Sequence, residues 1–341
     1  MGAQKKIRVL VVDDSVVSRE MIVRGISVDP QIEVVAVAAD AFEARDKIVE
    51  VNPDVITCDI EMPRMSGIEF VRRLLPQYFV PIIMVSAISN AVFEAMEAGA
   101  VDFVAKPGAG SPQAVETFIR DLSLKIKTAA MAKAVMRRQS GAAGNVTGNL
   151  AQEAGSLIAI GASTGGTEAI YNILRCLPPA MPGIVIVQHI PPVFSKMFAE
   201  RLDNQTALRV KEAETGDYAD AGHVLIAPGD RHMRVKKVGG RYQVECFQGE
   251  KVNGHCPSVD VLFESAAKEA GKKAIGILLT GMGYDGAKGL LSMRRMGCRT
   301  IGQDEATSVV YGMPKVAYDI GAVEMQAALE NIPQMLSELL G

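Results

Sequence analysis

Residues 157–166 read LIAIGASTGG, and this stretch decides how the second half of the chain folds. Its first four residues form an apolar run that predicts a buried strand, and the segment after the glycines predicts a helix. Ser163 therefore stands at a strand tip, in a turn whose glycines let a substrate approach the backbone closely. A serine in such a turn serves as a helix cap, a phosphate ligand or a nucleophile. The residues that follow two later strands favour the nucleophile.

The composition limits the class of protein. The 341 residues suggest two or three domains. No apolar run approaches the roughly 18 residues that cross a bilayer, and Asp13-Asp14 interrupts the apolar start too early for a signal peptide. The net charge of −3 gives no reason to expect nucleic acid or an anionic membrane as a partner, and the five scattered cysteines indicate a reducing compartment without a zinc site. We therefore expect a cytoplasmic protein with no nucleic-acid partner and no membrane insertion.

Two α/β blocks follow one another along the chain. In each, short apolar runs alternate with helical patterns, which predicts a doubly wound, parallel sheet. We expect domains over 5–127 and 156–341, the second mostly parallel with a β-hairpin, and a linker over 128–155 that is rich in Ala, Gly, Asn and Gln. The expected strands are 7–12, 32–38, 55–60, 82–85 and 103–105, then 157–160, 184–187, 224–226, 275–279 and 300–301. The hairpin is expected over 235–242, and helices of the second block over 168–176, 194–202, 258–270 and 287–296.

Acidic residues stand where strands of the first block end. Asp13-Asp14 ends the first strand, Asp59 ends the third with Glu61 close behind, and Lys106 follows the fifth. Ligands of open α/β sheets bind at these carboxyl ends. Crowded carboxylates repel one another unless a hard cation lies among them, and Mg²⁺ suits such a set. The sequence therefore predicts Mg²⁺ held by Asp13, Asp14, Asp59 and Glu61.

The chemistry expected there is phosphoryl transfer. Asp59 attacks a phosphoryl donor as a carboxylate nucleophile, while Mg²⁺ and Lys106 stabilise the spread charge. Ser86, at the end of the fourth strand, is placed to donate a hydrogen bond to the new phosphoryl group. Helix caps or solvated loop acids are the alternative for any one of these residues, and Asp14 before Ser15 reads as an ordinary cap. The acids, the serine and the lysine at successive strand ends favour the site.

This first block resembles a two-component receiver domain, which has a flavodoxin-like fold. The segments that carry the resemblance are Val11-Val12-Asp13-Asp14-Ser15, Asp59 to Gly67, Ser86-Ala87 and Lys106-Pro107. The resemblance implies that Asp59 is the phosphoacceptor, that a histidine kinase is the donor and that Phe103 is the switch aromatic alongside Ser86 and Lys106. Ser66 departs from the family, where many relatives have Asp.

A histidine and an aspartate follow two later strands of the second block. His189 comes directly after 184–187, and Asp285 follows 275–279 within a glycine-rich turn. Because tips of neighbouring strands converge, His189 can accept the proton of Ser163 and Asp285 can hold the imidazole. Backbone amides near Thr164, Met282 and Gly283 are the expected oxyanion donors.

Other interpretations of these residues remain open. His189 before Ile-Pro-Pro alone reads as a half-buried structural histidine, and Asp285 before Gly286 alone as a turn residue. The other three histidines are rival bases: His223 begins a strand, at the wrong end for this site, His232 lies beside the hairpin, and His255 lies in a glycine-rich loop.

Two motifs in this block also match the patterns of other protein classes. GASTG at 161–165 matches the GxSxG turn of α/β-hydrolases, but that family orders its triad Ser, acid, His, and no histidine follows Asp285. GMGYDG at 281–286 fits the dinucleotide pattern GxGxxG, and Asp304 lies about 20 residues further on. In a dinucleotide-binding turn the negative charge of Asp285 would repel the pyrophosphate, which binds where the potential is positive.

The second block is similar to the catalytic domain of the chemotaxis protein-glutamate methylesterases. The matching segments are 160–166, Gln188-His189, Ala227-Pro228-Gly229, 257–263 and 279–286. The resemblance implies the triad Ser163, His189 and Asp285, hydrolysis of glutamyl methyl esters on cytoplasmic chemoreceptor domains, deamidation of receptor glutamines, and an unphosphorylated receiver that restricts access. It implies no cofactor for the ester hydrolysis. Cys256 replaces what is often a basic residue in relatives. The alternatives are a response regulator whose second block only binds a partner or DNA, and a dinucleotide enzyme.

Overall fold

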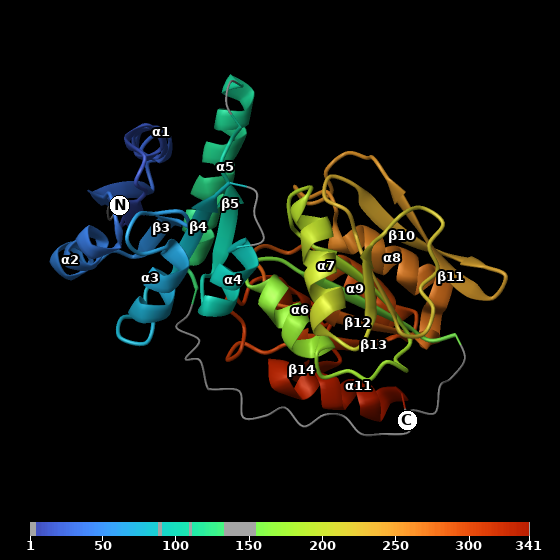
Figure 1. Cartoon of the computed structure of the whole chain (residues 1–341). Coiled ribbons are helices and arrows are strands. Elements are labelled where there is room, and N and C mark those ends of the chain that lie inside the picture. Colours follow the sequence, from blue (N-terminus) through green and yellow to red (C-terminus); the bar gives the residue numbers. More distant parts are fainter. Residues whose placement is uncertain (1–4, 88–90, 109–110, 133–154, 341) are drawn as a thin grey trace. The chain divides into compact units, whose positions relative to one another are not determined.

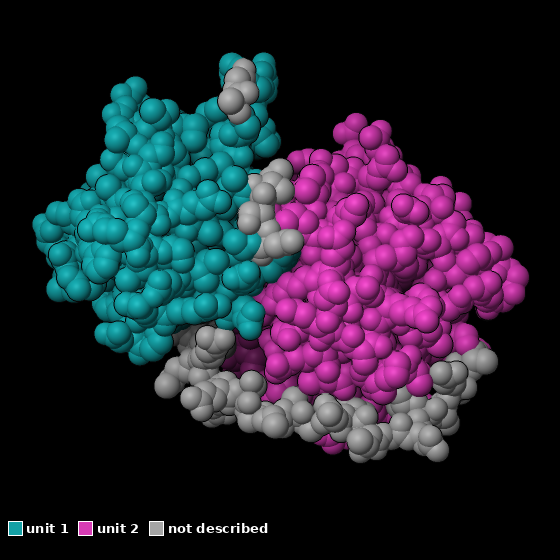
Figure 2. Space-filling view, viewed as in Figure 1, with its two compact units in different colours: residues 1–134 teal, residues 135–341 magenta. Residues whose placement is uncertain are grey.

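The structure is a computed structural model that describes residues 5–87, 91–108, 111–132 and 155–340. The chain divides into two compact units, residues 1–134 and residues 135–341 (Figure 2). Most of the predicted linker, residues 133–154, lies outside the described residues, and its first residues, Thr128 and Ala129, complete a helix. Among the described residues, no helix has an apolar stretch long enough to cross a bilayer.

The first unit is a parallel sheet between two layers of helices (Figure 1). Its elements are β1 (Ile7–Val12), α1 (Val16–Ile26), β2 (Ile32–Ala38), α2 (Ala41–Val51), β3 (Val55–Asp59), α3 (Gly67–Leu74), β4 (Ile82–Ser86), α4 (Ala91–Ala98), β5 (Asp102–Ala105) and α5 (Pro112–Ala129). The strand order is β2-β1-β3-β4-β5, all parallel, which confirms the predicted doubly wound sheet. The order reverses between β1 and β3, the place where such sheets bind ligands.

Side-chain caps fix where these helices begin. The hydroxyl of Ser15 accepts a hydrogen bond from the Ser18 N–H at 3.3 Å, so Ser15, and not Asp14, caps α1. Ser66 caps α3 in the same way by accepting from the Glu69 N–H. The departure at Ser66 therefore has a structural role in this chain.

The second unit is a larger parallel sheet with a separate hairpin (Figure 1). Its strands are β6 (Leu157–Ala162), β7 (Gly183–Gln188), β8 (Arg209–Glu212), β9 (His223–Ile226), β10 (His232–Val238), β11 (Arg241–Phe247), β12 (Ala274–Leu278), β13 (Arg299–Gln303) and β14 (Met325–Ala327). Its helices are α6 (Gly166–Leu174), α7 (Phe194–Gln205), α8 (Val259–Ala270), α9 (Ala287–Arg295), α10 (Met313–Asp319) and α11 (Ile332–Leu340), with 3₁₀ turns η1 (Gly271–Lys273) and η2 (Leu329–Asn331). The order β14-β13-β12-β6-β7-β9-β8 is wholly parallel, and β10 pairs with β11 alone, antiparallel.

One hydrophobic cluster of this unit lies between one face of the sheet and α8. Alternate residues of β6 and β7, such as Leu157 and Val185, face the same cluster as Leu262 and Phe263 of α8 and Met233 of the hairpin. β6 lies in the middle of the sheet, with β7 on one side and β12 on the other. The strand order therefore reverses at β6, and a ligand crevice is expected beyond its carboxyl end.

The structure differs from the sequence-based prediction at the edges of this sheet. The short outermost strands β8 and β14 were not predicted, because an edge strand exposes one side and lacks a continuous apolar run. The predicted hairpin 235–242 is the tip of a longer one that begins at His232. These differences leave the strands that carry the candidate residues unchanged.

Candidate active site

Ser163 and His189 occupy neighbouring strand ends. Ala162 at the end of β6 pairs with Gln188 at the end of β7, so the next residue of each strand lies at the same edge. The His189 N–H donates to the Ala162 carbonyl at 3.1 Å, and the Ser163 N–H donates to the Thr280 carbonyl, beyond β12, at 3.0 Å. Backbone bonds thus join all three strand ends at the place where the sheet order reverses.

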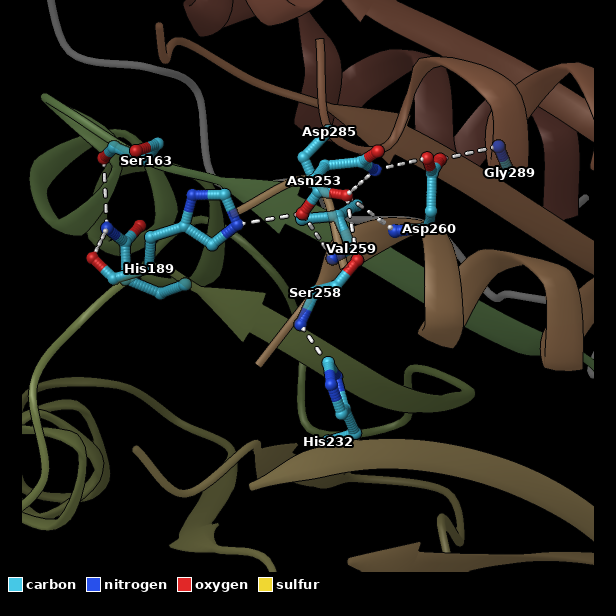
Figure 3. A network of polar contacts seen from close by, with 10 residues as sticks. Ser163, His189, His232, Asn253, Ser258, Val259, Asp260, Asp285 and Gly289 are labelled. Carbon is cyan, nitrogen blue, oxygen red and sulfur yellow. Dashed lines mark hydrogen bonds and ion pairs between the residues drawn. The ribbon is translucent and has the colours of Figure 1, made fainter. Parts of the chain in front are cut away.

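His189 is paired with Asp285. Its Nε2 lies 2.9 Å from Oδ2 of Asp285, and both side chains are almost fully buried, at 8% and 1% exposure. The ionised carboxylate accepts only, so Nε2 carries the proton and Nδ1 is the basic nitrogen. In Figure 3 the imidazole lies between Ser163 and Asp285. Nδ1 is buried and has no hydrogen-bond partner among the described residues. The structure therefore forms the acid–imidazole contact and leaves the hydroxyl–imidazole contact unmade.

The N-terminus of α8 holds the Asp285 carboxylate. Its donors are Ser258 Oγ at 2.7 Å, the Val259 N–H at 2.7 Å, the Asp260 N–H at 3.3 Å and Asn253 Nδ2 at 2.8 Å. Burial alone would raise the pKa of Asp285, but the bond and charge of His189 and the bonds from Asn253 and Ser258 hold it well below its usual range. A carboxylate in this setting stays ionised, and it takes the place of a side-chain cap that α8 lacks.

The glycine-rich turn after β12 lies against Ser163. A β-carbon on Gly281 would come within 2.7 Å of Cβ of Ser163. The hydroxyl of Thr280 donates to the Thr164 carbonyl at 3.0 Å, which joins the two turns. These contacts place the turn that begins at Thr280 against Ser163 and Thr164, and Met282 and Gly283 are the next residues of that turn. Their role as oxyanion donors stays a prediction.

The other three histidines, which the sequence left as possible bases, lie at different positions and make different contacts. His223 begins β9, at the opposite end of the sheet from Ser163. His232 is buried, with Nε2 2.9 Å from the Glu250 carbonyl and Nδ1 accepting from the Ser258 N–H at 3.2 Å, so it holds the start of α8. His255 stacks on His189, with ring centroids 3.7 Å apart and planes 8° from parallel.

Asn253, which the sequence analysis did not single out, also belongs to this network. The pair Asn253-Gly254 is a strong hairpin-turn signal, and it was the available clue. The dinucleotide interpretation loses support, because Asp285 is buried in the GxGxxG turn, where a pyrophosphate would need positive potential. Asp304 accepts from the N–H and the hydroxyl of Thr307, which gives it a structural role.

In the first unit, three acids converge at the ends of β1 and β3. Ligand atoms of Asp13, Asp14 and Asp59 all lie within 4.8 Å of one another. Nζ of Lys106 lies 2.9 Å from Asp13 and 2.5 Å from Asp59. Burial and the nearby charge of Asp13 raise the pKa of Asp59 more than the contact with Lys106 lowers it. Glu61 was expected in this group but is exposed and outside it, and only its N–H approaches Asp59.

The expected switch residues lie on β4, β5 and just beyond. The hydroxyl of Ser86 is buried and has no hydrogen-bond partner within the described residues. Phe103 is buried at 3% exposure and meets Phe93 of α4 edge-on, with centroids 6.2 Å apart. The Lys106 N–H donates to the Ser86 carbonyl at 2.7 Å, which ties the ends of β4 and β5 together beside Asp59.

Comparison with known proteins gives the same division of the chain. Residues 158–336 match the family model for CheB methylesterase, and residues 9–137 match that for a response regulator receiver domain. A protein-glutamate methylesterase/protein-glutamine glutaminase of Syntrophomonas wolfei is 56% identical over 98% of this chain and 98% of its own length. One of Pseudomonas aeruginosa is 46% identical over 97% of this chain and 96% of its own length. The crystal structure of the Thermotoga maritima CheB methylesterase catalytic domain covers 54% of this chain and 98% of that chain at 40% identity, with a TM-score of 0.53. The chain therefore belongs to the CheB methylesterase family and carries a receiver domain ahead of its methylesterase domain.

Proposed function

We propose that this protein hydrolyses glutamyl methyl esters on the cytoplasmic domains of chemoreceptors and deamidates receptor glutamines, with Ser163, His189 and Asp285 as its catalytic triad. The observation that carries the assignment is the 2.9 Å contact between His189 Nε2 and Asp285 Oδ2, at the strand end next to Ser163. The protein acts in the cytoplasm, in chemotaxis adaptation. Methanol release from methylated receptor fragments tests the activity, and its absence with and without a phosphodonor would contradict the proposal.

The geometry supports a two-step acyl transfer. Ser163 Oγ attacks the ester carbonyl while Nδ1 of His189 takes its proton, and the buried charge of Asp285 stabilises the imidazolium that forms. The imidazolium returns the proton to the departing methoxide, which leaves as methanol. Water then attacks the acyl-enzyme with His189 again as base, freeing the glutamate and Ser163. With a glutamine substrate the same steps release ammonia.

The turns on either side of Ser163 supply the remaining part of the mechanism. Backbone N–H groups near Thr164, Met282 and Gly283 are the proposed donors to the oxyanion of the tetrahedral intermediate. One such donor is worth about 3–4 kcal/mol of the barrier.

Replacing Gly281 with alanine tests whether this turn sets the position of Ser163. The new β-carbon would lie 2.4 Å from Sδ of Met313 and 2.7 Å from Cβ of Ser163, so one of the two segments must move. We expect kcat for methanol release to fall about 10–100-fold, because small displacements of a nucleophile have effects of this size. Phosphorylation of Asp59 in the same variant is the internal control. An unchanged kcat would show that the turn does not fix the serine.

The receiver domain controls this activity through Asp59. The carboxylates of Asp13, Asp14 and Asp59 form the group that would hold Mg²⁺, and the ammonium of Lys106, which contacts two of them, supports a cation at this place. When bound, Mg²⁺ neutralises charge on the transferred phosphoryl group. Asp59 accepts that group from a chemotaxis histidine kinase, Lys106 pairs with it, and the hydroxyl of Ser86, which has no hydrogen-bond partner in the described part of the chain, donates to it.

Asp59→Asn tests this control. The carboxamide cannot form the acyl phosphate, so we expect a small-molecule phosphodonor such as acetyl phosphate to lose its stimulation of methanol release. The measurement is the ratio of rates with and without the donor and Mg²⁺, in the variant and in the parent protein. Stimulation of the same size in both proteins would place the phosphoacceptor elsewhere.

A further inference from the structure

The segment Val252–His255 forms a tight turn beside the triad. The Val252 N–H donates to the His255 carbonyl at 3.0 Å, and the His255 N–H donates to the Val252 carbonyl at 2.9 Å. The two residues between them, Asn253 and Gly254, have φ of 54° and 84°. This is the backbone of a type I′ turn, for which Asn-Gly is the favoured pair. The side chains of Asn253 and His255, on either side of Gly254, therefore project from a stiff hairpin with a two-residue turn.

Asn253 joins two buried carboxylates. Its Nδ2 donates to Oδ1 of Asp285 at 2.8 Å and to Oδ2 of Asp260 at 2.7 Å, so one amide group uses both of its protons on two acids (Figure 3). Asp260 is also held by the Gly289 N–H at 2.6 Å. Without the amide, two carboxylates of like charge would meet with nothing between them. Asn253, together with Ser258 Oγ and the Asp260 N–H, thus occupies Oδ1 of Asp285 and leaves Oδ2 for the imidazole.

His255 covers one face of His189. The rings lie 3.7 Å apart and within 8° of parallel, which is a stacked contact. The bond to Asp285 fixes one ring nitrogen, but it leaves the ring free to swing about the axis through that bond. A flat group against its face removes this freedom and keeps Nδ1 in one direction.

From these contacts we propose that the turn Val252–His255 is a positioning element of the esterase, in which Asn253 orients the Asp285 carboxylate and His255 orients the His189 ring. The inference rests on the proposed triad and extends it by two residues that do not touch the substrate. It assigns a reason to the Asn-Gly pair, which the fold of the sheet itself does not require.

The stacked ring is suited to this task because it is uncharged near neutral pH. Burial, then the charges of His189 and Lys251, lower the pKa of His255 to about 4, against the opposing effect of Asp285. A neutral ring adds no positive charge beside the imidazolium that forms on His189 during the reaction. It also shields that imidazolium from water on one face.

The pair His255→Ala and His255→Phe separates positioning from simple structural support. In His255→Ala we expect kcat for methanol release to fall about 10–100-fold with KM changed less than about twofold, the size typical of groups that orient a catalytic residue. His255→Phe keeps a flat neutral face and should recover most of the lost kcat. Equal losses in both variants, or an unchanged kcat in His255→Ala, would overturn the role of His255.

Asn253→Gly tests the role of Asn253, because glycine keeps the positive φ of the turn and removes only the side-chain amide. We expect the rate at which a serine-directed phosphonate ester labels Ser163 to fall about 10-fold or more in this variant. An unchanged labelling rate in Asn253→Gly would overturn the proposal for Asn253. Failure of the phosphonate to label Ser163 in the parent protein would instead contradict the triad itself, so the two failures are distinguishable.

Discussion

Replacing Ser163 with alanine will reduce kcat for methanol release by about 10⁴-fold or more, because the step that forms the acyl-enzyme has no other nucleophile in this geometry. The residual rate will reflect whatever the backbone donors and substrate binding contribute alone. The measurement is release of labelled methanol from methylated receptor fragments. The proposed phosphorylation of Asp59 is the control, since Asp59 belongs to the other unit and its phosphorylation is expected to proceed at the parent rate.

Covalent trapping gives the same assignment without a substitution. A serine-directed phosphonate ester should modify the parent protein once, and mass spectrometry of the digest should place the adduct on Ser163. Methanol release that persists in Ser163→Ala, or an adduct on another residue, would refute the assignment of Ser163 as the nucleophile. The proposal for the receiver domain would still stand.

The second large effect is expected from Asp285→Asn, which should reduce kcat by about 10⁴-fold, as loss of the acid does in other triads. The carboxamide removes the charge that stabilises the imidazolium. Its NH₂ group replaces one carboxylate oxygen and cannot accept from the donor it then faces, which is Ser258 Oγ at the Oδ1 position or the Val259 N–H at the Oδ2 position. We therefore also expect a loss of at least about 2 kcal/mol in the free energy of unfolding.

Asp260→Asn is the matched control for that variant. Asp260 lies at the same helix start and also accepts from Asn253, but the imidazole of His189 contacts Asp285 and not Asp260. Burial raises the pKa of Asp260, so the loss of its charge costs less free energy than the loss of the charge of Asp285. We expect its kcat to fall less than about 10-fold. Equal losses in Asp260→Asn and Asp285→Asn would mean that the helix start matters and the acid of the triad does not.

The stability of the parent protein should depend on pH through the same residue. The pKa of Asp285 is depressed in the folded state, so its contribution is fully present above the unfolded value of about 3.9 and is lost as pH falls through the lower folded value. Asp285→Asn lacks this contribution at every pH. The difference in unfolding free energy between the two proteins should therefore narrow below about pH 4, which urea unfolding at a series of pH values measures.

The sequence predicted the central strands because each is buried on both faces and reads as a continuous apolar run, as in 157–160 and 184–187. It missed β8 and β14, since an edge strand needs no such run. The strand-end positions of Ser163, His189 and Asp59 followed from the same argument, because parallel strands place their carboxyl ends at one edge.

Contacts between loops could not be predicted in this way. Glu61 follows Asp59 by two residues, yet it turns to solvent, because nothing in strand periodicity fixes a side chain beyond the strand. His255 was noticed only as a rival base, and its face-to-face contact with His189 depends on a turn in another part of the chain. Asn253 was missed for the same reason.

The carboxylate of Asp285 has a consequence for how this enzyme can change over evolutionary time. A helix that is capped by its own residue can keep its start when residues of a neighbouring active site change. The start of α8 instead depends on Asp285, an acid from the turn before α9. If Asp285 is also the acid of the proposed triad, folding and chemistry depend on one side chain, and a substitution there affects both. Stabilising substitutions elsewhere in the core could restore the lost folding energy, but they would not restore turnover.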